Sequence, residues 1–365
     1  MKNVRLVPCV LVLPVLAACG GEAKPAAKSV EAPPALSAPA ASAQRPDGAP
    51  PQVAPKATQA EGQKKALLAL QAAYDAKDPK AYAELYSEGG ALIALGPQGF
   101  REEAKGRPAI EASQKALFER METKGVMTRV LQRDELAVYE WIASGTDKES
   151  GKKVSFRGAG VLTFDTDGKI TKEYSYVDPL TPAMQVGKFP GKPRETAAPG
   201  GETAWVVAKK DGAEDKQVEL VKGGWPVAWP KKDKKAIDAL FADDVVFEPV
   251  AQPSDAKGRA ETVRAFEAMT KAVPDASVTL DTSWSAGPFV VSAFTVKGTQ
   301  KAPFGLASKV TGKPLVLHGL EIAEVRGGKV ARATWYTSNV ELLGQLGLLP
   351  EPKAPAKTSM LEDRR

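Results

Sequence analysis

Residues 151–158 read GKKVSFRG, and residues 312–319 in the second half of the chain read GKPLVLHG. A second agreement lies upstream, because the AKGR of residues 104–107 recurs unchanged at residues 256–259. The distance between paired segments drifts only from 152 residues (104 to 256) to 161 residues (151 to 312), as changes in loop length would produce. The sequence therefore predicts a tandem duplication of one domain.

The spacing of apolar residues predicts the same order of elements in both copies. In the first copy, a helix that carries Leu67 and Leu70 precedes a second helix over residues 78–86, with Asp78 as N-cap and Pro79 as first helical residue. A third helix and an antiparallel sheet follow, and this order indicates an α+β fold in which helices cover one face of a curved sheet. The strands are expected over 126–131, 136–143, 154–164 and 170–177, and in the second copy over 277–284, 289–296, 315–325 and 330–337.

The inventory of ionisable residues excludes several classes of site. The chain of 365 residues has one histidine, His318, and two cysteines. A nucleophilic triad needs a histidine beside the nucleophile, and a zinc site usually needs three or four Cys or His ligands. The 50 Lys and Arg only slightly exceed the 44 Asp and Glu, and the densest basic run, at residues 231–235, surrounds the start of a helix. We expect no cofactor, no metal and no nucleic-acid partner.

The first 60 residues indicate export and anchoring. Residues 1–18 have a positive start and an apolar stretch, as a signal peptide does, and end in Leu-Ala-Ala before Cys19. This ending resembles the bacterial lipobox, which implies cleavage before Cys19 and acyl chains such as palmitate that hold the protein to a membrane. The alternative is an ordinary secretory cleavage beside a chance cysteine. Gly20, where Asp would resemble an inner-membrane retention signal, favours the outer membrane of a Gram-negative cell, with the protein facing the periplasm or the surface.

Composition divides the rest of the chain. Residues 19–60, rich in Ala and Pro, cannot bury enough apolar surface to fold and are expected to form a disordered linker. Residues 61–187 form the first predicted domain, residues 188–204 a connector, residues 205–349 the second domain, and residues 350–365 a polar tail.

Three segments of the second copy carry a resemblance to a known family. They are the FADDVVF of residues 241–247, the Gly-Thr to Thr-Gly-Lys segment of residues 298–313, and the Gly-Lys-Val to Gln-Leu-Gly segment of residues 328–347. In these features the chain resembles the SnoaL-like polyketide cyclase family of the nuclear transport factor 2 superfamily, which also includes ketosteroid isomerase. The resemblance implies two tandem cone-shaped domains, each with about three helices packed on a curved antiparallel sheet around an apolar pocket.

The resemblance also implies a catalytic role for Asp178, whose position carries the acid/base carboxylate of the cyclases. A second interpretation is structural, because Asp178 before Pro179 is also a helix N-cap. Its counterpart Ser338 forms, with Glu341, an expected Ser-x-x-Glu capping box. Asp and Ser are interchangeable as caps but not as proton acceptors, and both copies lack the histidine that commonly follows the Gly-Thr pair in the cyclases. The structural interpretation is therefore favoured.

Aromatic and polar residues of the predicted strands are candidates to line the pockets. Arg157 could bind an anionic ligand, but an ion pair with Asp134, Glu135 or Glu140 is favoured. His318 is favoured as a structural polar group. Trp225 and Trp229 are candidates to close a pocket mouth or to join the two domains. The candidate lining residues are Tyr139, Trp141, Arg157 and Tyr176 in the first copy, and Phe294, His318, Trp335 and Tyr336 in the second.

Three functions remain open. The leading hypothesis is a lipid-anchored, non-enzymatic pair of domains that binds a small apolar ligand or a protein partner at the cell envelope. The alternative is a cyclase- or isomerase-like enzyme that uses Asp178 of the first domain as acid/base. In the third, the pockets are filled and the sheets form an interaction surface, either between the two domains or in a homodimer.

Overall fold

The computed structural model describes residues 56–195 and 201–350, which form two domains of the same α+β design. The predicted signal peptide, Cys19, most of the linker and the tail lie outside the described residues. The first domain contains α1 (Lys56–Ala76), α2 (Pro79–Glu84), β1 (Tyr86–Gly96), β2 (Gly99–Lys105), α3 (Arg107–Arg120), β3 (Met121–Arg133), β4 (Leu136–Asp147), β5 (Lys153–Phe164), β6 (Ile170–Val177) and α4 (Leu180–Val186). The second contains α5 (Gly212–Gly223), α6 (Trp225–Lys231), α7 (Lys234–Leu240), β8 (Phe241–Pro249), β9 (Ala256–Lys257), α8 (Arg259–Ala272), β10 (Ser277–Ala286), β11 (Phe289–Thr299), β12 (Pro314–Arg326), β13 (Lys329–Tyr336) and α9 (Asn339–Leu346).

Each domain has one curved sheet. The strand order is β2-β1-β6-β5-β4-β3-β7 in the first sheet, where β7 is Ala204–Val207 of the connector, and β10-β11-β12-β13-β8-β9 in the second. The four antiparallel strands predicted in each copy are confirmed, with longer bounds at most ends. β1 runs parallel to β6, and β8 runs parallel to β13 in the same way, so the two sheets share one topology.

Two strands in each domain were missed by the sequence prediction. The pair β1–β2 lies between α2 and α3, and the pair β8–β9 lies between α7 and α8, where no strand is expected from the pattern. In the first domain α2 ends at Glu84 and β1 starts at Tyr86, so the chain passes from helix to strand without a loop that would mark the boundary.

The connector contributes a short strand to the first sheet. β7 (Ala204–Val207) pairs in parallel with β3, with Trp205 opposite Val130. The hydroxyl of Thr203 donates to the carbonyl of Met127 at 2.8 Å, which holds the start of β7 in place. The domain boundary expected at residue 205 therefore falls inside a strand that belongs to the first sheet.

Side-chain capping bonds form at one pair of corresponding helices, α2 and α7, and are absent at another pair, α4 and α9. Asp78 accepts a hydrogen bond from the amide of Ala81 at 2.9 Å, which confirms it as N-cap of α2, and Asp233 accepts from Ala236 at 2.9 Å before α7. The predicted capping box at α9 is wrong, because Ser338 makes no side-chain cap bond. The predicted N-cap at Asp178 is also wrong, because α4 starts at Leu180 and its N-cap residue is Pro179.

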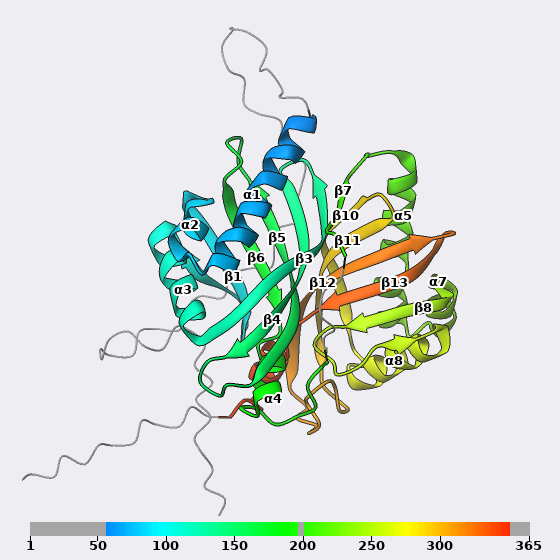
Figure 1. The fold of residues 1–365 in the computed structure, drawn as a ribbon. Coiled ribbons are helices and arrows are strands. Elements are labelled where there is room, and N and C mark those ends of the chain that lie inside the picture. The colour runs from blue at the N-terminus through cyan, green and yellow to red at the C-terminus, as the bar shows by residue number, and fades with distance from the viewer. Residues whose placement is uncertain (1–55, 196–200, 351–365) are drawn as a thin grey trace, which may run out of the picture.

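The molecule has four layers, with helices outside and the two sheets packed against each other in the middle (Figure 1). A hydrophobic cluster between the sheets combines residues of both domains, among them Tyr174 and Tyr176 from β6 and Leu320 and Ile322 from β12. Both faces of each sheet are therefore buried, one against its own helices and one against the other sheet.

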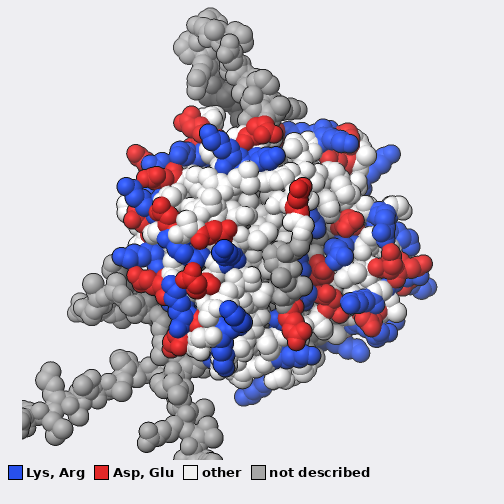
Figure 2. All heavy atoms as spheres, viewed as in Figure 1, with Lys and Arg blue, Asp and Glu red and all other residues white. Residues whose placement is uncertain are grey.

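On the face seen in Figure 2, acidic and basic side chains are interspersed over both domains. Within the described ranges, no helix has the length and apolar character needed to cross a bilayer.

Candidate functional site

The cone of the first domain holds a cavity of about 340 Å³ that is partly open to solvent. Its lining comes from α1, α2, α3, α4 and strands β1 to β6, and it is mainly apolar. Strand periodicity places these side chains, because every second residue of each strand points toward the helices. The aromatic residues on the lining are Tyr74, Tyr82, Tyr139, Trp141 and Phe156.

A buried carboxylate, Glu173 on β6, lines this cavity. Tyr139 on β4 donates its hydroxyl to one carboxylate oxygen at 2.6 Å, and Tyr86 at the start of β1 donates to the other. The ring of Tyr82 stacks on that of Tyr86 with the centroids 5.9 Å apart. We call Glu173, Tyr82, Tyr86 and Tyr139 the glutamate–tyrosine cluster.

Burial governs the ionisation of this cluster. It raises the pKa of Glu173, and the hydrogen bonds from Tyr139 and Tyr86 offset this effect only in part. Burial also raises the pKa of both tyrosines well above its usual value, so their hydroxyls are donors at neutral pH. A carboxylate charge at this position is stabilised by two neutral donors alone, which makes it costly without a further partner.

Other charged residues of the lining are paired within the protein. Arg101 on β2 forms an ion pair with Glu103 at 2.9 Å. Lys188, which follows α4, pairs with Asp147 at 3.2 Å and with Glu149 at 2.6 Å. Burial alone would raise the pKa of Asp147, but hydrogen bonds from Ser150 and Lys188 bring it below its usual value.

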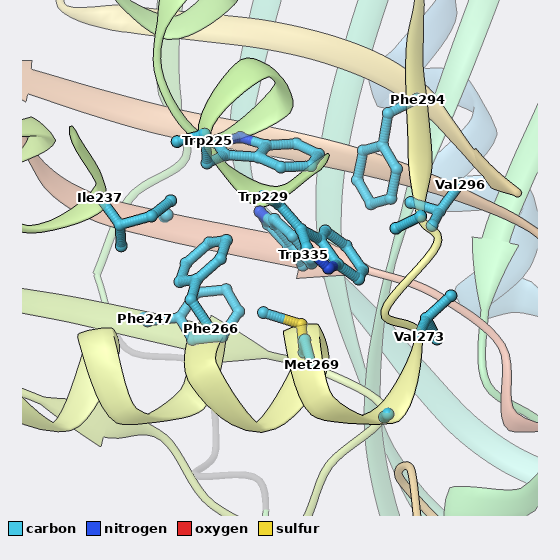
Figure 3. Close-up of a cluster of buried hydrophobic side chains, with 14 of the residues drawn as sticks. Trp225, Trp229, Ile237, Phe247, Phe266, Met269, Val273, Phe294, Val296 and Trp335 are labelled. Atoms are coloured by element: carbon cyan, nitrogen blue, oxygen red, sulfur yellow. The ribbon is translucent and has the colours of Figure 1, made fainter. Parts of the chain in front are cut away.

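The corresponding cone of the second domain is filled by aromatic side chains (Figure 3). The ring of Trp225 lies 4.5 Å from that of Trp335 and 5.2 Å from that of Phe294, measured between centroids. The second domain does have a hollow of about 220 Å³, but its lining comes from α6, α7, α8 and the residues that join α6 to α7, and not from the sheet.

The filled cone also contains a buried glutamate. Glu321 on β12 accepts the indole N–H of Trp225 at 2.8 Å and that of Trp335 at 3.0 Å. Burial raises the pKa of Glu321 to about 7, against the lowering effect of these two hydrogen bonds.

The repeat shows which substitutions separate the open cone from the filled one. Lys77 follows α1 and Lys232 follows α6, and both have a left-handed φ of 57°, so we align the two copies at these lysines. Leu70 lies seven residues before Lys77, and Trp225 lies seven residues before Lys232. Leu70 therefore corresponds to Trp225. Glu321 pairs with Trp335 across the second sheet, whereas the first sheet has Gly160 paired with Ser175 at this place. Trp225 and Trp335 thus occupy space that Leu70 and Ser175 leave empty.

The predicted lining residues divide into three groups. Tyr139 and Trp141 line the cavity of the first domain, as expected. Phe294 and Trp335 point into the second cone but form its packed core, so the expectation of a pocket there is corrected. Arg157, Tyr176, His318 and Tyr336 lie on the other face of their strands, between the two sheets, because side chains alternate along a strand.

The residues between the sheets form a polar cluster of their own. Arg157 donates to the hydroxyl of Tyr336 at 3.2 Å, and that hydroxyl donates to Glu140 at 2.6 Å. Arg157 also lies 3.9 Å from Glu140 and 3.7 Å from Glu248 of the second domain. The favoured ion pairing of Arg157 is therefore confirmed, and it joins the two domains.

Asp178 lies outside the cavity, although its neighbours Val177 and Pro179 line it. Its carboxylate accepts hydrogen bonds from the amide and the side-chain amide of Asn339, each at 3.0 Å, and from the hydroxyl of Thr181 at 3.0 Å. Burial raises its pKa, and these hydrogen bonds oppose the rise. Asp178 thus holds the first residue of α9, a helix of the other domain, rather than a substrate.

His318 and Glu341 also hold the domains in place. Glu341 accepts from the amide of His318 at 2.9 Å and lies 2.5 Å from its Nδ1. The imidazole packs against Phe100 of the first domain with centroids 5.0 Å apart. His318 thus has the structural role that the sequence favours. The side chain of Glu341 bonds to His318 and so does not form the expected capping box at the start of α9.

Glu173 is the site residue that the sequence analysis missed. The sequence did carry a signal for it. Glu173 is an acidic residue within a predicted strand, and side chains two positions apart, such as Glu173 and Ser175, lie on the same face of a strand. Strand periodicity alone does not say which face this is, and the neighbouring Lys172 makes this part of the strand look exposed.

Comparison with known proteins places both halves in one family. The family model described as SnoaL-like domain matches residues 67–173 and 224–333. No curated protein matches the chain. Solved structures match one domain each. TsrD from Streptomyces laurentii is 22% identical over 39% of this chain and 100% of its own, with a TM-score of 0.34. A protein from Catenulispora acidiphila with a ketosteroid isomerase-like fold is 24% identical over 38% and 98%, with a TM-score of 0.31. An epoxide hydrolase from Mycobacterium tuberculosis is 18% identical over 37% and 92%, with a TM-score of 0.31.

Proposed function

Because the chain belongs to the SnoaL-like domain family, with one family domain in each half, we propose that the first domain binds a small, mainly apolar ligand in its cone while the second serves as a closed structural partner. One observation carries the proposal. The first cone holds a cavity of about 340 Å³, whereas aromatic side chains fill the second. A cavity of this size and lining suits a small aromatic or aliphatic molecule.

We propose binding rather than catalysis as the function. A reaction through Asp178 has no support, because both of its carboxylate oxygens are engaged by Asn339 and Thr181, away from the cavity.

The binding function is tested with 2-naphthylmethanol, a neutral two-ring probe, by isothermal titration calorimetry on the full chain. Leu70→Trp places in the first cone the residue that fills the second, and we expect the affinity to fall at least about tenfold. Leu68→Trp is the matched control, because Leu68 lies on the same helix with 46% of its surface exposed. Absence of binding to the wild type, or equal binding by both variants, would contradict the proposal.

A second candidate function, proton transfer, is favoured by one observation. Glu173 is a carboxylate with a raised pKa on the wall of an apolar cavity, as a general base requires. Deuterium exchange from solvent into the α carbon of 1-tetralone separates the candidates. Exchange above background that Glu173→Gln abolishes would establish catalysis, and exchange at background would support binding alone.

We also propose that acyl chains on Cys19 anchor the protein in the outer membrane. The support is the Leu-Ala-Ala-Cys sequence of residues 16–19 and Gly20 after it. Mass spectrometry of the mature N-terminus tests this proposal. An acylated Cys19 as first residue is expected, and an unmodified residue 19 would refute the anchor.

A further inference from the structure

We propose that the ligand of the first cone carries a protonated amine, which Glu173 receives among aromatic rings. This inference rests on the proposed binding function and specifies the class of ligand. It is argued from the charge of the site, its aromatic lining and the pairing of the cations around it.

The carboxylate of Glu173 has no cationic partner among the described residues. Its hydrogen bonds come from Tyr86 and Tyr139. Two other buried glutamates are neutralised by a nearby cation: Glu140 by Arg129 at 3.2 Å and Glu248 by Arg332 at 2.5 Å. Buried Glu214 accepts instead from three backbone amides, those of Lys209, Lys210 and Gly287, and lines no cavity in the described structure. A buried carboxylate that lines a cavity and lacks such a partner is stabilised by a cation brought by the ligand.

Glu321 provides an internal comparison. It is also buried without a cationic partner in the described chain, but its two donors are the tryptophans that fill its cone, so no ligand can reach it. In the first cone the same kind of carboxylate lies on the wall of an accessible cavity. The cavity therefore supplies what the second cone lacks, a route by which a charged group reaches the carboxylate.

The rings around the cavity suit a cation. Tyr82, Tyr139, Trp141 and Phe156 all contribute to the lining. An ammonium group near aromatic rings is attracted by their quadrupoles, most strongly where water is excluded. The protein itself shows this preference nearby, since Nζ of Lys77 lies 4.4 Å from the ring centroid of Tyr74.

An anionic ligand would find the cations of the lining already engaged. Arg101 is paired with Glu103, and Lys188 is paired with Asp147 and Glu149. Arg120, the third cation of the lining, also has an interaction partner. An anion would in addition place a second negative charge beside Glu173, which the apolar surroundings make unfavourable.

The experiment compares three probes of one shape, by calorimetry on the full chain at neutral pH. They are 2-naphthylmethylamine, which is protonated, the neutral 2-naphthylmethanol, and the anionic 2-naphthoate. We expect the amine to bind at least about tenfold more tightly than the alcohol, and the naphthoate to bind most weakly. This comparison needs no variant and so does not depend on whether a mutant folds.

Two variants then locate the preference. Glu173→Gln keeps the shape and removes the charge, and should bring the amine and the alcohol to within about twofold of each other. Glu321→Gln makes the same change at a carboxylate that no ligand reaches, and should leave the tenfold preference intact.

The outcomes separate this inference from the function on which it rests. If the alcohol binds as tightly as the amine, or if Glu173→Gln keeps the preference, the amine assignment is wrong while ligand binding stands. If none of the three probes binds, both the inference and the proposed function are wrong.

Discussion

At the scale of single residues, the two cones differ in how they accommodate one buried glutamate each. Glu173 has two tyrosine donors and lies on a cavity wall, whereas Glu321 has two tryptophan donors and lies in a packed core. Both have a pKa raised by burial, so the folded protein holds their protons more tightly than the unfolded chain does. The stability of each domain is therefore linked to pH.

Glu321→Gln should change how stability depends on pH. The pKa of Glu321 in the folded protein is about 7, above the ordinary value of 4.5. The stability that its protonated form contributes is therefore fully present below pH 4.5 and is lost as pH rises through 7. The loss is on the order of 3 kcal/mol. Urea unfolding of both proteins at pH 5 and pH 8 measures it. We expect the advantage of the wild type over the variant to shrink by that order, and an equal difference at both pH values would contradict the assignment.

Asp178→Ala should destabilise the protein without closing the cavity. The change leaves the amide groups of Asn339 and the hydroxyl of Thr181 without their buried acceptor, at a cost of about 2–4 kcal/mol. Binding of 2-naphthylmethanol should stay within about twofold of the wild type.

The matched control is Ser338→Ala at the corresponding position. The hydroxyl of Ser338 is buried and makes no hydrogen bond within the described structure, so chemical unfolding should show a change below about 0.5 kcal/mol. A large loss of stability in Ser338→Ala would support the capping interpretation of this position. Loss of ligand binding with unchanged stability in Asp178→Ala would support the catalytic interpretation of Asp178.

Predictions for single residues succeeded where the interaction involves only residues close together in the sequence. The N-cap at Asp78 depends on a few neighbouring residues and was predicted correctly. The bonds of Asp178 and Glu341 depend on partners far along the chain, Asn339 in the other domain and His318 on a strand. A capping pattern in the sequence does not reveal such competitors.

At the scale of elements, glycines on one strand make room for aromatic rings on the next. Gly160 of β5 lies opposite Tyr139 of β4, and a Cβ at Gly160 would come within 2.1 Å of the Tyr139 ring. In the second domain Gly319 of β12 lies opposite Phe294 in the same way, with a separation of 2.2 Å. These glycines let rings lie flat across the strand on the cone side of each sheet.

Gly160→Ala should therefore disturb the cavity through Tyr139. The added methyl group must displace the ring and so weaken its hydrogen bond to Glu173, with a loss of about 1–3 kcal/mol in stability and a lower affinity for 2-naphthylmethylamine. Thermal unfolding and calorimetry measure the two effects.

Gly62→Ala is the control for this prediction. Gly62 lies in α1, and a methyl group added there would meet no atom within 4 Å, so alanine should stabilise the helix by up to about 1 kcal/mol. If Gly160→Ala were as harmless as Gly62→Ala, the close approach of Tyr139 would not constrain the site.

The element scale also explains which pocket residues were predicted wrongly. Period-two alternation groups Tyr139 with Trp141 and separates Tyr176 from Glu173, but it does not say which group faces the helices. In an ordinary two-layer domain, the sheet face away from the helices would be polar, and this would show which side chains point toward the helices. Here a second sheet covers it, so both faces are apolar and Tyr176 looks the same as a cone residue.

At the scale of the whole molecule, the two sheets form one buried interface. Arg157, Asp178 and Phe100 of the first domain contact Tyr336, Asn339 and His318 of the second, respectively, around the apolar cluster between the sheets. The tandem repeat and the fold of each copy were predictable from the sequence. The four-layer packing was one of several open arrangements, since nothing in one copy specifies what covers its sheet.

We expect the two domains to unfold together. Separating them would expose the apolar cluster, remove the hydrogen bonds of Asn339 to Asp178 and remove that of Tyr336 to Glu140. Differential scanning calorimetry should show one transition whose calorimetric and van't Hoff enthalpies agree. Two resolved transitions would show that the interface contributes little.

The connector strand β7 makes this interface a property of one chain. Contact between two separate copies would obey mass action and weaken on dilution, whereas two sheets joined through residues 204–207 stay together at any protein concentration. Separate copies would also be bound by symmetry, with the same residues on both sides of the contact. The two domains of one chain are free of that constraint and can differ in sequence. The cone of the second domain can therefore be filled while its sheet still packs against the sheet of the first domain.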